Sequence, residues 1–349
     1  MVSYFFPFEY INIKHINMKH KFLFALLAVV VTAGLSSCHQ SGKDYSDMND
    51  EEKLEIINIR LKKTPDDAEL LFDRAGIYIN QERYNDAITD LMKATELESK
   101  NKEYLMRLGD TYFRIGDMEH SYKAIERVTE LDPKYKDAYM KLGEIAFYSK
   151  DYDRAMEHLS KVTADDPNNQ NALFMKGFIY KETEDTANAA FYFRKVIDLY
   201  PDYEPAYEEL GFLYANHGSP MAVEYLNTAI KLEPNNTQAM YGLAMYFQEK
   251  QRMDEAEELY SRITEINPAH KDAWHNLGYI ECFHYGDFDK AIEYFNRAIE
   301  CDGQFVEALT NRGWAYSLKG DKKNARISYQ SALEKDPNYQ PALDGLKSL

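Results

Sequence analysis

Cysteine and tryptophan are scarce in this chain, which contains three and two of them among its 349 residues. Three cysteines cannot build a framework of several disulfides, so the fold must depend on a hydrophobic core. In the register of the chain's 34-residue repeat, Cys282 and Cys301 would lie on the order of 15 Å apart on two antiparallel helices. That separation is too long for a disulfide bond. We therefore expect both to be free thiols that behave as small apolar residues.

Positive charge is also scarce. The chain carries 41 lysine and arginine residues against 58 aspartate and glutamate residues, for a formal net charge of −17. No basic stripe offsets this excess, and a negative field repels the phosphate backbone of DNA and RNA. The composition therefore predicts that no nucleic acid is among the partners.

The sequence lacks the spacings that mark common catalytic sites: it has no HExxH, no glycine-rich phosphate loop, no nucleophile elbow and no CxxC. The most suggestive group of possible metal ligands lies in the seventh copy, between residues 270 and 284. There His275 and Cys282 share a helical face, but Glu281 points about 100° away from Cys282, so a third ligand is missing. We predict no catalytic residue, no metal site and no cofactor, and hence a protein that is not an enzyme.

The chain has one long hydrophobic run, the ten residues at 22–31. It is shorter than the ~20 apolar residues that a bilayer span needs. Basic residues within 18–21 precede the run and small residues follow it, an order that predicts a secretory signal peptide over residues 18–37. A single-pass anchor that is never cleaved is the alternative. Residues 1–17 fit neither a signal nor a fold, and we interpret them as a start-site artefact upstream of Met18.

The residues before Cys38, namely Leu35, Ser36 and Ser37, resemble the lipobox of bacterial lipoproteins. The resemblance implies that Cys38 becomes the mature N-terminus and is lipidated, and several acyl chains make a stable membrane anchor. No aspartate directly follows Cys38, so the inner-membrane retention signal is absent. The resemblance therefore implies a lipid anchor in the outer membrane, facing the periplasm. Residues 38–50 are polar and acidic and would form a tether.

From residue 68 onward the chain repeats with a period of 34 residues. One copy is a residue short near Gly218, and another is a residue long near Gly286. Residues 51–66 resemble part of a copy that would cap the start of the array, and residues 340–349 begin another that would cap its end. The full copies cover residues 68–101, 102–135, 136–169, 170–203, 204–236, 237–270, 271–305 and 306–339.

Each copy consists of two helical patterns joined by a short turn. The first helix often carries glycine, as at Gly109 and Gly177, which permits a partner helix to approach closely. The second helix carries a small residue near its start and a small or β-branched residue seven positions later. Most copies end in proline, which stops a helix. This pattern resembles the tetratricopeptide repeat (TPR). The resemblance implies an all-α, right-handed superhelical solenoid of about eight helical hairpins with partial capping helices.

In TPR proteins the exposed face of the first helices contacts the ligand. The chaperone-binding subclass clamps a terminal carboxylate there with lysine and asparagine, which are missing at the matching places, so that ligand is disfavoured. We expect about half of these positions to pack helix against helix and the rest to form an adaptable apolar groove. The groove residues placed by the repeat are Phe72, Met106, Phe113, Met140, Glu144, Phe147, Phe174, Phe178, Phe212, Tyr241, Met245, Tyr279 and Trp314.

These features predict a membrane-tethered, non-catalytic TPR scaffold in bacterial envelope assembly or secretion. Its partner would be a protein or peptide of basic or amphipathic character, because acidic residues surround the groove. Two alternatives stay open. Aromatic residues also stack on sugar rings, which would make the chain a glycan-binding envelope lipoprotein. The chain could also be an adaptor subunit of an enzyme carried on another chain.

Overall fold

The computed structural model describes residues 48–349, and every regular element in that range is a helix. The predicted signal peptide, Cys38 and the tether up to residue 47 lie outside the described residues. No helix between residues 48 and 349 is both long and apolar enough to span a bilayer. The prediction of an all-α fold is confirmed.

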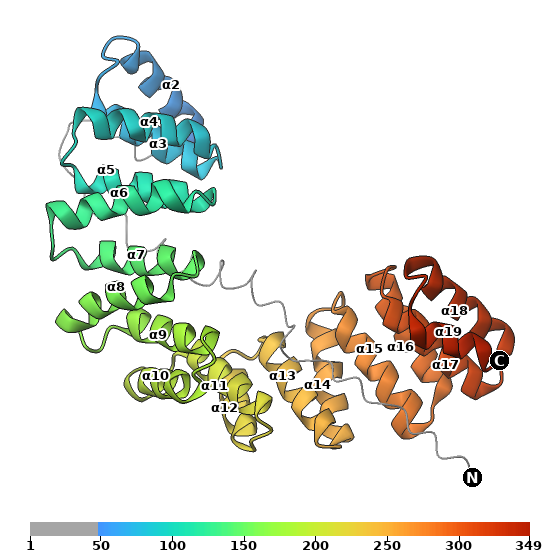
Figure 1. The fold of residues 1–349 in the computed structure, drawn as a ribbon. Coiled ribbons are helices and arrows are strands. Elements are labelled where there is room, and N and C mark those ends of the chain that lie inside the picture. Colours follow the sequence, from blue (N-terminus) through green and yellow to red (C-terminus); the bar gives the residue numbers. More distant parts are fainter. Residues whose placement is uncertain (1–47) are drawn as a thin grey trace. The chain divides into compact units, whose positions relative to one another are not determined.

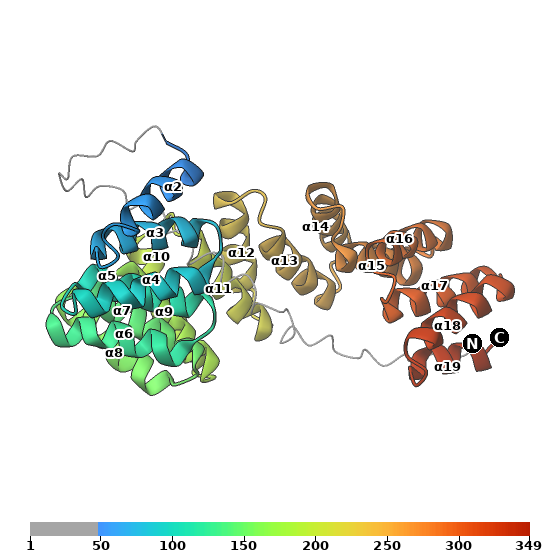
Figure 2. The same cartoon turned by 90° about the horizontal axis from the view of Figure 1, so that it is seen from above.

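The N-terminal unit of the described chain ends at Asp151. Each of its helices packs on the next one in sequence, as Figures 1 and 2 show. These helices are α2 (Asp50–Leu61), α3 (Ala68–Asn80), α4 (Tyr84–Leu97), α5 (Lys102–Arg114), α6 (Met118–Leu131) and α7 (Lys136–Tyr148). The odd-numbered helices are the first helices of their repeats.

The C-terminal unit runs from Tyr152 to Leu349 and follows the same rule of packing between consecutive helices. It contains α8 (Tyr152–Asp165), α9 (Gln170–Glu182), α10 (Thr186–Leu199), α11 (Glu204–Asn216), α12 (Met221–Leu232), α13 (Thr237–Glu249), α14 (Met253–Ile266), α15 (Lys271–Ile280), the π-helix η3 (Glu281–Tyr285), α16 (Phe288–Cys301), α17 (Val306–Lys319), α18 (Lys322–Lys335) and α19 (Gln340–Lys347). Each repeat window expected from the sequence therefore holds one pair of helices.

The glycines of the first helices are positions where a large side chain of the second helix enters. A Cβ atom on Gly177 would lie 2.5 Å from the ring of Phe193, and one on Gly313 would lie 2.5 Å from the ring of Tyr329. Such distances are far inside van der Waals contact, so only glycine fits without displacement. The expected close approach of the two helices is confirmed at these positions.

The small residues of the second helices form the centre of each hairpin. Every one of them is completely buried, with an exposed fraction of 0%. Burial of this kind explains the recurrence of small side chains, because a larger group would push the helices apart. The residues are Ala87, Ser121, Ala155, Ala189, Ala222, Ala256, Ala291 and Ala325, with Ala94, Val128, Val162, Val196, Ala229, Ile263, Ala298 and Ala332 seven positions later.

Each turn between the two helices of a repeat contains one residue in the left-handed conformation. Glycine takes this place in half of the turns, at 116, 218, 286 and 320, and other residues take it in the rest. Those others are Glu82, Lys150, Glu184 and Gln251, with φ near 60°. A side chain is strained there, whereas glycine is not.

The copy at residues 271–305 is one residue longer than the 34-residue period, and the extra residue lies inside a helix. After Ile280 the first helix continues as the π-helix η3, and Gly286 at φ 77° then closes the turn. A π-turn widens the helix by one residue per turn without breaking it, and such segments are frequent at functional sites. The sequence indicated where the insertion falls, but not that a helix would contain it.

Candidate partner-binding face

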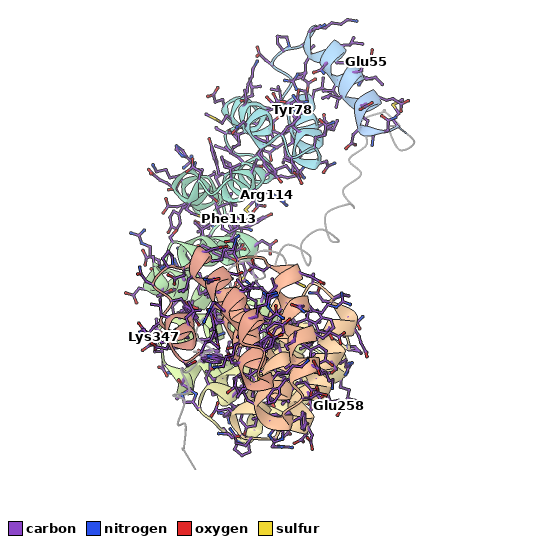
Figure 3. The ribbon with its side chains drawn as sticks, turned by 90° about the vertical axis from the view of Figure 1, so that its right-hand side faces the viewer. Glu55, Tyr78, Phe113, Arg114, Glu258 and Lys347 are labelled. Atoms are coloured by element: carbon purple, nitrogen blue, oxygen red, sulfur yellow. The ribbon has the colours of Figure 1, made fainter. Side chains whose placement is uncertain are left out.

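The predicted groove residues lie on one surface of the first helices, which we call the first-helix face. In the N-terminal unit it belongs to α3, α5 and α7, and in the C-terminal unit to α9, α11, α13, α15 and α17. Ten of those residues keep a partly exposed side chain, and their contact with a partner stays a prediction. They are Phe72, Met106, Phe113, Met140, Glu144, Phe147, Tyr241, Met245, Tyr279 and Trp314. Figure 3 labels Phe113, near the C-terminal end of α5.

Three of the predicted residues lie in the core instead. Phe174, Phe178 and Phe212 are 7%, 5% and 4% exposed. The rings of Phe174 and Phe178 pack around Phe193 of α10, at centroid distances of 5.5 and 5.4 Å. The Phe212 ring occupies the space that a Cβ atom on Gly242 would take. The expectation that these rings face a partner is corrected, because helix packing buries their surface.

Lys141 of α7 is the centre of the polar contacts on the N-terminal part of this face. Its Nζ lies 2.7 Å from Glu144 and 3.1 Å from Asp110 of α5, and it lies over the ring of Phe113 at 4.9 Å. Burial acts to lower the pKa of Lys141, but the charges of Asp110 and Glu144 outweigh burial and raise it. Glu144 is thus already paired within the protein, and it contributes less to an acidic surface than expected.

Cations of the chain lie over two partly exposed aromatic rings of the first-helix face. The Arg107 guanidinium lies 4.2 Å above the ring of Phe72, and Lys141 lies over the ring of Phe113 as described. In both pairs the cation belongs to the next repeat, whereas the Lys181 ammonium lies 5.4 Å from the buried ring of Phe178 in its own repeat. Each contact places a positive charge against the negative face of a ring.

A group of carboxylates lies at the start of α11 in the C-terminal unit. The side-chain amide of Asn236 donates to Glu204 at 2.7 Å and to Glu208 at 2.5 Å. Glu209 pairs with Lys181 of α9 at 2.5 Å. Burial raises the pKa of Glu204, and the hydrogen bond from Asn236 opposes that rise. The pair of Lys181 and Glu209 joins neighbouring repeats, and Asn236, the N-cap of α13, ties the start of that helix to α11. The carboxylates therefore serve packing as well as surface charge.

Asparagine amides link the first helices of the last repeats. Asn276 Nδ2 donates to the Tyr241 hydroxyl at 3.2 Å, and Asn311 Nδ2 donates to His275 Nε2 at 2.8 Å. His275 is 7% exposed and lies between the rings of Phe295 and Phe305, at centroid distances of 5.7 and 5.1 Å. Burial lowers the pKa of His275 to about 4, so the ring is neutral near pH ~7.

Three aromatic side chains of α15, η3 and α17 contact one another, and we call them the Phe283 cluster. It consists of Tyr279, Phe283 and Trp314, with centroid distances of 4.7 Å between the first two and 6.0 Å between the last two. Phe283 is 38% exposed, more than any predicted groove residue. Phe283 was not among the residues predicted from the sequence, because it belongs to the inserted π-helix; the long repeat window was the available signal.

Comparison with protein families assigns nearly all of the repeats. Residues 99–207 match the TPR domain of the cytochrome c-type biogenesis protein H family, and residues 68–101, 236–304 and 285–339 match tetratricopeptide-repeat families. This chain is a tetratricopeptide-repeat protein. The predicted solenoid of TPR hairpins is thereby confirmed. No curated protein matches the chain.

Solved structures of other TPR proteins resemble the fold of this chain. The C-terminal part of a TPR repeat-containing protein from Cytophaga hutchinsonii is 16% identical, with a TM-score of 0.60 over 69% of this chain and 99% of that one. A tetratricopeptide repeat protein from Parabacteroides merdae is 16% identical, with a TM-score of 0.50 over 70% of this chain and 97% of that one. At this identity the likeness concerns the fold alone.

The possible metal ligands predicted between residues 270 and 284 contact other parts of the protein or are buried. Glu281 pairs with Lys290 of α16, His275 is held by Asn311, and Cys282 is 3% exposed. Burial raises the pKa of the Cys282 thiol to about 12, which disfavours the thiolate that a metal needs. Within residues 48–349 no three histidine, cysteine, aspartate or glutamate side chains converge on a possible ion.

The two cysteines of the described chain are free thiols, as expected. Cys282 behaves as a small core residue. Cys301 is exposed, which corrects the expectation that it packs as an apolar residue. It is the last residue of α16, and its Sγ lies 3.5 Å from the carbonyl oxygen of Pro268.

Proposed function

We propose that this TPR protein is a non-catalytic scaffold that binds a protein or peptide partner on its first-helix face. Cys38 would tether it by a lipid anchor to the outer membrane of a bacterial envelope, on the periplasmic side, where it would serve envelope assembly or secretion. The anchor follows from the lipobox-like sequence, and partner binding is the common property of TPR proteins.

The observation that carries the proposal is the partly exposed aromatic and methionine side chains on first helices of both units. Met106, Met140 and Phe147 lie on α5 and α7, and Tyr279 and Trp314 lie on α15 and α17. Apolar side chains of this kind are adaptable contacts for a helix or an extended peptide. The match of residues 99–207 to the TPR domain of a cytochrome c-type biogenesis protein fits a role in assembly.

The test is a pull-down from solubilised membranes with the wild type and a variant in which Met140, Phe147 and Tyr279 are changed to alanine. We expect the variant to lose a specific partner, because half-buried anchors carry most of the binding energy of an interface. The control is Phe191→Ala, which removes a phenylalanine that is 54% exposed on α10, a second helix. Identical partners for all three proteins would refute binding on the first-helix face.

The anchor is tested independently by labelling cells with radioactive palmitate. The wild type should be labelled and should fractionate with membranes, whereas Cys38→Ala should be unlabelled. Label retained in the variant would show that Cys38 is not the acylated residue. Because this readout does not involve a partner, the anchor and the binding role can fail separately.

A further inference from the structure

The last repeat differs from the others in the sign of its charge. Each of the seven repeats between residues 68 and 305 contains more acidic than basic side chains, whereas residues 306–339 contain six basic and four acidic ones. Four of the six basic residues fall between Lys319 and Arg326, and no other eight consecutive residues of the chain carry as many. All repeats share one fold, so folding alone does not explain the reversal.

The first turn of α18 is a place where a helix disfavours cations. Lys322 and Lys323 are the first two residues of α18, and no acidic residue lies in that turn. Six of the seven other second helices carry an acidic residue there, as α16 does with Asp289. The positive end of the helix dipole favours acidic side chains and repels lysine. The two lysines therefore do not serve the stability of the helix.

Two exposed aliphatic side chains accompany these cations. Leu318 is 55% exposed near the end of α17, and Ile327 is 48% exposed on α18. Lys323 precedes Arg326 by three residues and Ile327 by four, so its side chain adjoins both on one side of the helix. We call this surface, at the C-terminal end of the chain in Figure 1, the α18 patch. It consists of Leu318, Lys319, Lys322, Lys323, Arg326 and Ile327, all of them exposed.

Two cations of the α18 patch are available to a ligand. Within residues 48–349 the side chains of Lys323 and Arg326 have neither an ion pair nor a hydrogen bond. Lys319 pairs with Asp289, whose side chain is 76% exposed, and Lys322 donates to the carbonyl oxygen of the last residue at 2.7 Å. An exposed ion pair contributes little free energy, so an anionic ligand can replace Asp289.

The net negative charge of the chain acts only weakly at the α18 patch. Exposed charges are largely screened beyond about 8–10 Å at physiological salt, and most acidic residues belong to other repeats. Asp321, the N-cap of α18, lies close by, but its carboxylate accepts hydrogen bonds from the backbone and side-chain N–H groups of Asn324 at 3.0 and 2.6 Å. The cations of the patch therefore set the local field.

We propose that the α18 patch contacts the surface of an anionic phospholipid bilayer. Basic side chains beside aliphatic ones suit such a surface, because the cations meet phosphate groups while the aliphatic groups reach the acyl boundary. An acidic protein fits less well, since the hot spots of protein interfaces favour tryptophan, tyrosine and arginine over leucine. The inference goes beyond the proposed function, because it concerns the second helix of the last repeat and not a partner on the first-helix face.

The test mixes the full chain with vesicles of phosphatidylcholine, or of phosphatidylcholine and phosphatidylglycerol in equal parts, each with a dansyl lipid as energy acceptor. The two tryptophans of the chain are Trp274 and Trp314, so energy transfer to dansyl reports how closely the C-terminal unit approaches the bilayer. Any attachment through the N-terminal residues is common to all samples. We expect transfer to rise with phosphatidylglycerol and to fall at high salt, which screens the cations.

Substitutions locate the contact. Lys323→Gln combined with Arg326→Gln should lower the equilibrium constant for contact about tenfold or more, because each basic side chain near an anionic surface adds to binding. Leu318→Ser should lower it about two- to fivefold by removing aliphatic surface. Lys231→Gln combined with Arg194→Gln removes the same charge from exposed positions on α12 and α10, and this control should leave contact unchanged. All five side chains are exposed, so the fold tolerates these changes.

Two results would overturn the proposal. Equal transfer with both kinds of vesicle would show that the patch does not recognise anionic lipid; if the variant of Lys323 and Arg326 then loses a protein in the pull-down, the occupant is an acidic protein. An equal loss of transfer in the control would show that general charge, and not the patch, causes the contact. The readout depends on neither Cys38 nor the first-helix face, so the proposed function can fail separately.

Discussion

His275 makes the stability of the last repeats depend on pH. Its side chain is held neutral by burial between Phe295 and Phe305, with Asp272 as the only nearby charge that favours the protonated form. Protonation would also place a second N–H against the Asn311 amide, which now donates to Nε2 at 2.8 Å. The folded protein therefore resists a proton that the unfolded chain accepts.

The sign and size of the effect follow from linkage. The pKa of His275 falls from its ordinary value of 6.5 to about 4 in the folded state. Stability is complete above the unfolded pKa and is lost as the pH falls toward the folded pKa, because only the unfolded state binds the proton in that range. The loss amounts to about 2 kcal/mol between pH ~7.5 and pH ~5, and to about 3 kcal/mol by pH ~4.

The assay is urea unfolding followed by tryptophan fluorescence at a series of pH values. The chain has two tryptophans, Trp274 on α15 and Trp314 on α17, so the signal reports on the repeats that contain His275. His275→Gln removes the titrating group and serves as the reference for every other ionisable residue. The difference in unfolding free energy between wild type and variant should shrink by about 2 kcal/mol from pH ~7.5 to pH ~5.

Parallel pH profiles for the two proteins would refute this reasoning, because they would mean that His275 titrates in the folded state as it does in the unfolded chain. A lower free energy of unfolding for His275→Gln at all pH values would be compatible with this titration. A constant difference between the two proteins measures the lost ring contacts, whereas the change of that difference with pH measures proton binding by His275.

Three further substitutions test the packing of the repeat. Replacing Glu184 by glycine should raise stability by about 0.5–1 kcal/mol, because glycine avoids the strain of φ 61°. Changing Gly177 to alanine should lower it by about 1–3 kcal/mol, because the new Cβ would lie 2.5 Å from the Phe193 ring. Changing Asp90 to alanine should cost about 2–3 kcal/mol, because the Arg74 guanidinium would lose both of its 2.7 Å hydrogen bonds to that carboxylate.

Urea unfolding followed by circular dichroism measures these three changes, and each has its own control. Gly303→Ala is matched to Gly177→Ala and should be neutral, since nothing lies within 4 Å of its Cβ position; an equal loss in both would contradict the close helix approach. Adding Arg74→Met to Asp90→Ala should recover part of the loss, and no recovery would exclude a buried charge as its cause. A lower free energy of unfolding for Glu184→Gly would contradict the claim that the left-handed backbone at this turn strains the glutamate.

The residues that build the hairpin could be predicted because their role is the same in every copy. A small side chain such as Ala189 or Ala256 is completely buried, since the two helices of its repeat meet at that point. The recurrence of a residue type at a fixed spacing then contains the structural information directly. The left-handed turn residues were equally regular, but three residue types other than glycine occupy them and hide the pattern: Glu82, Lys150, Glu184 and Gln251 share their backbone conformation.

The residues of the first-helix face could be predicted only in part, because their exposure depends on the neighbouring repeat. Phe212 and Tyr279 occupy the same place in their windows. Phe212 is 4% exposed because Gly242 of the next first helix leaves room for its ring. Tyr279 stays partly exposed. No rule based on one repeat position can separate the two cases.

The charge of the first-helix face also depends on contacts between neighbouring repeats. Glu144 fits an acidic surround when it is considered alone, but Lys141 lies three residues before it and holds it at 2.7 Å. Neighbours at this spacing meet on one side of a helix, so the pairing was visible in the sequence. The contribution of Asp110 was not visible, because it comes from α5, a full repeat earlier. Net charge therefore overstates how much negative surface the first-helix face offers.

The inserted residue of the long repeat shows why a departure from the repeat is more informative than the repeat itself. A hairpin loop can accept an extra residue at little energetic cost, since loops tolerate insertions. Here a π-helix accepts it instead, although π-helices are rare. The result is an aromatic side chain, Phe283, at a place in the window where most other copies carry a polar or charged residue. The ring of Phe283 packs on Tyr279 and Trp314 and stays 38% exposed, so the insertion adds a partly exposed aromatic side chain to the first-helix face that no other copy predicts.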